Sequence, residues 1–96
     1  MRFNWRVLIL TPTALPTITG NAVTAERWKR SLLNRNVSVN VVAAESLSVA
    51  DLLSLLDRFR PDLIHVHHAF RTGALLLDSR VAPRWMEVPL VVSPAG

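Results

Sequence analysis

The chain has 96 residues, half of them apolar, and its 11 basic side chains against 7 acidic ones give a formal net charge of +4. A chain of this length forms one small domain, too slight to enclose a two-lobed active site, which counts against a self-sufficient enzyme. The sequence contains no cysteine, so disulfides and thiolate metal sites are excluded.

Neither a membrane span nor a nucleic-acid partner is expected. The aliphatic runs, such as residues 7–10, are far shorter than the roughly 18 residues of a membrane-spanning helix. Thr11 and Pro12 interrupt any secretory h-region, so we expect a cytoplasmic protein. In the densest basic cluster, residues 27–30, Arg30 follows Glu26 at the favourable i, i+4 spacing, which indicates a solvated helix face.

The first half of the chain alternates strand and helix patterns. Residues 4–11 hold an aliphatic run that is apolar on both faces, typical of a central strand covered by helices on each side. A loop rich in Thr and Pro, 12–20, leads to a helical pattern over 21–35, which Asn36 ends because Asn tolerates the left-handed conformation. The alternation of valines with polar residues over 37–41 predicts an edge strand.

The middle of the chain continues the alternation. Ser48 and Asp51 have the spacing of a capping box, and the stripe of apolar residues that follows, Leu52, Leu55, Leu56 and Phe59, predicts a helix. Pro61 ends this helix, since a residue before proline avoids the α region. Residues 63–66 predict a third, buried strand.

The remaining elements complete a β-α-β-α-β-α-β pattern. Phe70, Ala74, Leu77 and Val81 predict a helix that Pro83 terminates, and residues 90–93 predict a fourth strand. The pattern predicts a single α/β domain over 1–96, a Rossmann-like three-layer sandwich with a parallel four-stranded sheet.

The burial patterns predict the strand order 2-1-3-4, as in flavodoxin-like sheets, because the first and third strands are apolar on both faces and the second is an edge. Ligands of open α/β sheets bind where the strand order reverses, at the carboxyl ends of the strands. The loop 12–20 and the segment 65–73 should therefore face one crevice.

All three histidines lie in that second segment. His67 is the catalytic candidate, because it stands where the strand opens into the crevice and can donate hydrogen bonds to a hydroxyl or phosphate oxygen. His65, on the same face of the strand, is a candidate core imidazole. An alternative is a His-x-His metal site, for which Asp62 and Asp78 are the nearest carboxylates in sequence.

The other candidates are substrate-binding residues around the same crevice. Gly20 precedes a helix N-terminus, where free N–H groups favour phosphate, and Asn21 is a cap or a polar ligand. His68 stands beside the catalytic candidate. Arg71 and Thr72, at the start of the next helix, supply a cation and a hydroxyl.

Two segments resemble the N-terminal half of GT-B glycosyltransferases of family 4. The stretch from Ile18 to Trp28, running on to Asn36-Val37-Ser38-Val39, resembles the family's glycine loop, first helix and turn into the second strand, with Asn36 at a usual glycine. The stretch Pro61-Asp62-Leu63-Ile64-His65-Val66-His67-His68 and the following 69–73 resemble its third strand end. Ser93 to Gly96 resemble the start of its strand-four loop.

The resemblance implies a retaining transfer of a sugar from a nucleotide-sugar donor to a sugar or glycolipid acceptor, with no cofactor. Gly20 matches the loop glycine that approaches the acceptor and the donor phosphate, and His67 matches the histidine that contacts the donor sugar. Such enzymes bind the donor chiefly in a second domain, which these residues do not contain. We therefore expect an acceptor-side domain or fragment that is inactive alone.

Two further expectations remain open. A non-enzymatic flavodoxin-like binding or regulatory module is the alternative function, although the first strand lacks the acidic pair of response-regulator receivers. The fourth strand is apolar and predicts a homodimer through its exposed edge.

Overall fold

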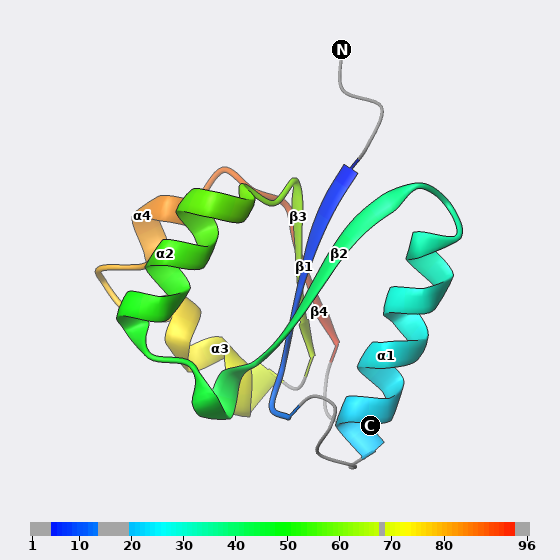
Figure 1. Cartoon of the computed structure of the whole chain (residues 1–96). Helices are drawn as coiled ribbons and strands as arrows, with labels where there is room; N and C mark the ends of the chain where they lie inside the picture. Colours follow the sequence, from blue (N-terminus) through cyan, green and yellow to red (C-terminus); the bar gives the residue numbers. More distant parts are fainter. Residues whose placement is uncertain (1–4, 14–19, 68, 94–96) are drawn as a thin grey trace.

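The computed structural model of the chain describes residues 5–13, 20–67 and 69–93. Within these ranges the strands form one parallel sheet in the order β2-β1-β3-β4 (Figure 1). They are β1 (Trp5–Thr11), β2 (Val37–Ala43), β3 (Leu63–His67) and β4 (Leu90–Ser93). The predicted α/β class and the predicted strand order are confirmed.

Helices lie on both faces of the sheet, so the domain has three layers. Helix α1 (Gly20–Leu33) packs on one face, and α2 (Val49–Phe59), α3 (Ala69–Leu77) and α4 (Ala82–Trp85) pack on the other (Figure 1). A 3-10 turn, η1 (Ala44–Ser46), links β2 to α2. No helix in the described ranges combines the length and the apolar composition needed to cross a membrane.

The alternation of side chains along β1 divides the core between the two faces. Val7 and Ile9 pack with Ala25 beneath α1. Leu8 and Leu10 point to the opposite face, where they join the leucines of α2. All four β1 side chains are buried, as predicted for a central strand, whereas every residue of the edge strand β2 is half-buried.

The helix boundaries follow from local chemistry. The Ser48 hydroxyl accepts from the backbone N–H of Asp51, and the Asp51 carboxylate accepts from the N–H of Ser48, so the predicted capping box is present. Asn36 ends the turn after α1 with φ 60°, the left-handed conformation predicted for it. Arg60 ends α2 with φ 51°, which places it outside the right-handed α region, as expected before proline.

The predicted helix over residues 70–81 is wrong in its C-terminal part. The structure divides it into α3 and α4 with a turn between them, in which the Asp78 carboxylate accepts from the Arg80 backbone N–H. Leu77 is 76% exposed, so it does not belong to a buried stripe. Pro83 stands in the first turn of α4, which begins one residue earlier at Ala82; proline suits this turn because its N–H would have no helical partner.

Candidate functional site

The carboxyl ends of β1 and β3 lie side by side at the point where the strand order reverses. Thr11 is the last residue of β1 and His67 is the last residue of β3. Helix α1 begins at Gly20, at the same edge of the sheet (Figure 1). The structure therefore brings the glycine position and the histidine segment to one edge, as the strand order predicted.

His67 is held on several sides at this edge. Its side chain is buried, with 4% exposure, and its Nδ1 lies 3.3 Å from the Thr11 hydroxyl oxygen. The indole of Trp28, from α1, meets the imidazole edge-on at a centroid distance of 4.8 Å. Contacts to β1 and α1 therefore fix the orientation of the ring.

Thr72 holds the backbone of the same residue. Its side chain is fully buried in α3, and its hydroxyl donates to the carbonyl oxygen of His67 at 2.7 Å. This bond gives a buried carbonyl at the strand end a side-chain donor from α3. Thr72 thus positions His67, and a direct contact between Thr72 and a substrate stays a prediction.

His65 lies one step inward on the same face of β3. Its imidazole stacks on Trp28 with centroids 4.3 Å apart and planes 21° from parallel. Its Nε2 forms a 2.7 Å hydrogen bond with the hydroxyl of Ser93, on β4. Burial, and secondly the proximity of His67, lower the pKa of His65 below its ordinary value of 6.5.

For the other predicted site residues that have not yet been described, the structure gives at most the position along a helix. Asn21 follows Gly20 in the first turn of α1, and Arg71 stands in the first turn of α3, so both belong to helices that begin at the carboxyl edge of the sheet. His68 lies outside the described residues. The role of His68 in substrate binding stays a prediction.

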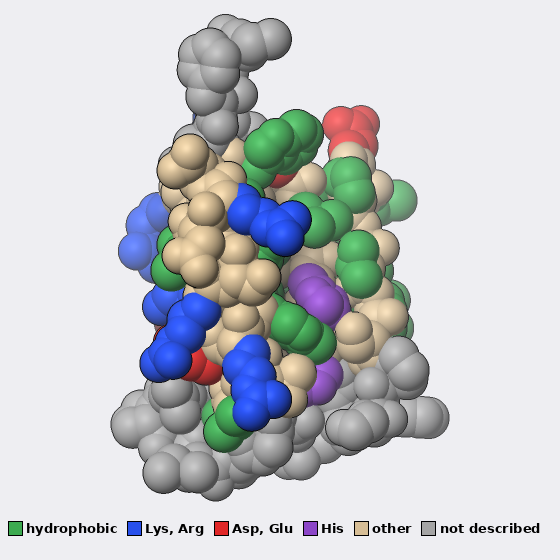
Figure 2. All heavy atoms as spheres, turned by 90° about the vertical axis from the view of Figure 1, so that its right-hand side faces the viewer, with side chains coloured by type: hydrophobic (Ala, Val, Ile, Leu, Met, Phe, Trp, Pro, Cys, Tyr) green, Lys and Arg blue, Asp and Glu red, His purple; other side chains and the backbone are tan. Residues whose placement is uncertain are grey.

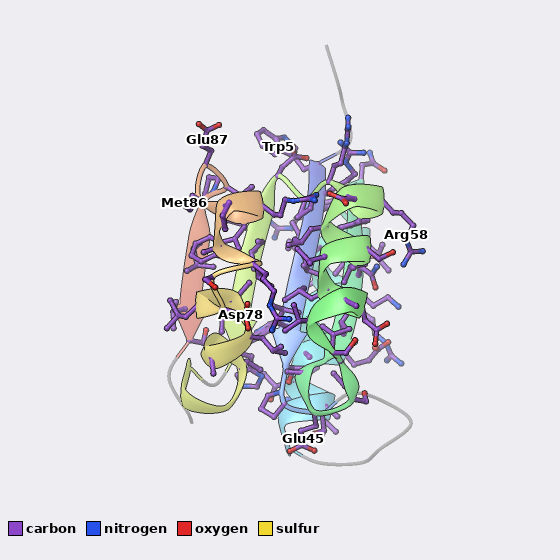
Figure 3. All side chains as sticks on the ribbon, turned by 90° about the vertical axis from the view of Figure 1, so that its left-hand side faces the viewer. Trp5, Glu45, Arg58, Asp78, Met86 and Glu87 are labelled. Atoms are coloured by element: carbon purple, nitrogen blue, oxygen red, sulfur yellow. The ribbon has the colours of Figure 1, made fainter. Side chains whose placement is uncertain are left out.

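The carboxylates considered for a metal site do not accompany the histidines. Asp62 precedes β3, about 16 Å from His67 at roughly 3.3 Å per strand residue, and it accepts from the backbone N–H of Arg6. Asp78 follows α3 on the far side of the sheet from α1 (Figure 3). Its pKa is lowered to about 2, first by the hydrogen bonds from Arg80. In the part of the chain that the structure describes, no three His, Asp or Glu side chains are grouped as metal ligands.

Thr11, Trp28 and Ser93 contact the histidines, and the sequence did not indicate these contacts. Trp28 packs on the inward face of α1, but its partners there depend on which strands lie below. For Thr11 the available signal was a hydroxyl at the end of an otherwise apolar buried strand, since a buried hydroxyl needs a hydrogen-bond partner.

Family models, curated proteins and solved structures were compared with this chain, and none of them matches it.

Proposed function

We propose that this chain is the N-terminal, acceptor-side domain, or a fragment of it, of a retaining GT-B glycosyltransferase of family 4. The reaction would transfer a sugar from a nucleotide-sugar donor to a sugar or glycolipid acceptor. One observation carries the proposal: His67, which matches the family's histidine, is a buried and oriented imidazole at the carboxyl end of β3, where the strand order reverses.

His67 would act as a hydrogen-bond donor to the transferred sugar. Its Nδ1 and the Thr11 hydroxyl are paired; when the hydroxyl donates to Nδ1, Nε2 carries a ring proton, and from this atom His67 would donate to a sugar oxygen. The edge contact with Trp28 and the bond from Thr72 hold the ring and its backbone in place. A preorganised donor suits a step in which charge develops on the substrate.

The start of α1 would approach the phosphates. The N–H groups of its first turn carry the positive end of the helix dipole, and Gly20 has no side chain to hinder an approaching ligand. We assign Asn21, His68 and Arg71 to the same crevice as further polar ligands. In this proposal the donor nucleotide is bound chiefly by a second domain, the chain alone is inactive, no cofactor takes part, and the location is cytoplasmic.

The test follows the amide resonances of the purified chain while inorganic phosphate, and separately methyl α-glucoside, is added. We expect the largest shifts at Gly20, Thr11 and His67. His67→Gln should abolish the glucoside-induced shifts, whereas His65→Gln, the matched control two residues away on the same strand face, should retain them at Gly20. Shifts confined to other surfaces would contradict the proposal and favour a flavodoxin-like binding module.

We also propose that β4 supports self-association through its open edge. Leu90, Val91 and Val92 are 38 to 49% exposed, and on its other side β4 pairs with β3. An apolar edge strand without charged residues invites pairing with another strand. Sedimentation of a substituted chain, described below, tests this interaction.

A further inference from the structure

The two faces of the sheet are covered unequally. Within the described residues, α2, α3 and α4 lie over one face and α1 over the other (Figure 1). α1 packs over β1 and β2, where it covers Val7, Ile9 and Val39. The β3–β4 half of that face has no helix among the described elements, although parallel sheets are ordinarily covered on both sides.

Apolar side chains remain accessible on this uncovered half. Strand alternation places Trp5, Leu63 and Val91 on the α1 face. Trp5 is 63% exposed, Val91 is 45% exposed, and Leu63 is half-buried. Together they extend from the amino end of β1 across the sheet to β4.

A groove runs between these residues and α1. It has a volume of about 260 Å³ and is lined by Val7, Trp28, Ser31, Leu32, Leu63 and His65. Figure 2 shows histidine side chains within a hollow that has hydrophobic side chains along it and basic side chains to one side of it. We call this depression, together with Trp5 and Val91, the α1–β4 groove.

The α1 side of the groove is basic. Arg27, Ser31 and Arg35 are spaced by four residues and so form one row along the helix, and Ser31 lines the groove. Arg35 lies just beyond α1, in a turn where its own N–H bonds the Leu32 carbonyl three residues back, and this 3-10 type of turn keeps it near the end of the row. Both arginines are exposed.

Neither of these arginines has a carboxylate partner within the described residues. The helix's one acidic residue, Glu26, pairs instead with Arg30 at 3.6 Å. Glu26 and Arg30 are spaced by four residues and form a row of their own, beside the row of Arg27 and Ser31. The groove thus combines an apolar floor with uncompensated positive charge along one side.

The positive charge of the arginine row indicates whether a second copy of the chain or an acidic helix fits the groove. A second copy seated face to face would bring the same arginine row and a second net charge of +4 toward the first, which is repulsive. A helix with acidic residues along one flank would be attracted by the arginine row, and its apolar face would cover Leu63 and Val91. Neighbouring helices pack with their axes 8–10 Å apart, so such a helix could lie beside α1 over β3 and β4.

We propose that the α1–β4 groove is the docking site for an amphipathic α-helix of a protein partner, with its apolar face on the sheet and an acidic flank along Arg27 and Arg35. The arrangement is the helix-in-groove mode of recognition, in which apolar anchors supply affinity and charge supplies orientation.

The experiment uses two synthetic 18-residue helical peptides with the same leucine face, one carrying glutamates and the other lysines along the flank. Binding to the full chain is measured by fluorescence anisotropy at protein concentrations where sedimentation shows a monomer. We expect the glutamate peptide to bind at least tenfold more tightly than the lysine peptide, with the difference shrinking at high salt.

Matched substitutions locate the site. Arg27→Glu with Arg35→Glu should reverse the preference between the peptides, whereas Arg58→Glu, on the solvent side of α2 (Figure 3), should leave it unchanged. Val91→Asp should weaken binding at least fivefold. Val92→Asp, at a similarly exposed neighbour on the opposite face of β4, should have little effect.

Three results would overturn the proposal. The first is equal affinity for both peptides. The second is a loss of binding with Val92→Asp that matches the loss with Val91→Asp. The third is a second copy of the chain as the occupant of the groove. The last would appear as concentration-dependent dimerisation that Arg27→Glu with Arg35→Glu strengthens. Circular dichroism of each variant separates a lost contact from a lost fold.

Discussion

The indole of Trp28 stacks on the imidazole of His65 with ring centroids 4.3 Å apart, and the same indole touches His67 edge-on. One side chain of α1 therefore contacts both histidines of β3. Through the bond between His65 and Ser93, the contact extends to β4. The attachment of α1 to the sheet and the orientation of the candidate catalytic residue thus depend on the same aromatic ring.

Trp28→Ala should destabilise the fold by roughly 2 to 3 kcal/mol, below the range for fully buried aromatic residues because Trp28 is half-buried. Urea denaturation followed by circular dichroism measures the change. Trp5→Ala is the control. Because Trp5 is 63% exposed, this substitution should change the free energy of unfolding little. Equal losses from the two substitutions would mean that Trp28 does not anchor α1.

Stability should fall as the pH is lowered through the ordinary histidine range. The pKa of His65 is lower in the folded chain than its ordinary value of 6.5, so the unfolded chain binds more protons between these values. The stability contribution of His65 is therefore complete above about pH 6.5 and is lost as the pH falls toward the folded pKa. The urea midpoint at pH 7.5 and pH 5.5 gives the measurement.

His65→Gln tests the origin of this pH dependence. Glutamine does not titrate and its amide can still bond the Ser93 hydroxyl, so the difference between the two urea midpoints should become smaller. A difference of the same size in the variant would assign the pH dependence to other groups.

Thr11→Val and Thr72→Val should affect His67 in different ways. The first removes the partner of Nδ1, so the chemical shifts of the ring nitrogens should change while the backbone of β3 keeps its shifts. The second removes the hydroxyl that donates to the His67 carbonyl and should lower the free energy of unfolding by roughly 0.5 to 1.5 kcal/mol, the net contribution of one hydrogen bond. Nitrogen-15 spectra of the histidine ring, with urea denaturation, distinguish the two effects; identical outcomes would refute these separate roles.

Val92→Pro should abolish self-association through β4. The Pro89 carbonyl accepts from the N–H of Ile64 in β3, and backbone groups alternate in direction along a strand, so the N–H of Val92 points away from β3. Proline there removes a donor from the open edge and leaves the pairing with β3 intact. Sedimentation velocity should show concentration-dependent dimers for the parent chain and monomers for the variant. A monomeric parent at high concentration would reject edge pairing.

The strand order could be predicted because the pattern of apolar residues in each strand indicates whether that strand is central or at an edge. Residues 7–10 are apolar on both faces, which suits a strand with neighbours on each side, and residues 37–41 alternate, which suits an edge. The capping box at Ser48 is equally local. Such features depend on neighbours in sequence, and the structure confirms each of them.

The features that the sequence did not indicate depend on neighbours in space. Thr11 and His67 are 56 positions apart, and His65 and Ser93 are 28 apart; each contact requires the lateral register of two strands, which spacing along the chain does not encode. The sequence did not predict the division between α3 and α4, and the reason is a different one. Leu77 and Val81 keep helical spacing, but a turn anchored by Asp78 separates them.

Because β1 is central, its two edges become paired at different times while the chain is being synthesised. β1 pairs with β2 on one side and with β3, which begins at Leu63, on the other. During synthesis, a nascent chain that has produced β1, α1 and β2 still presents the second edge of its most apolar strand until β3 has emerged. Chaperone binding or aggregation at that stage would involve residues 7–10, all of which are buried in the complete fold.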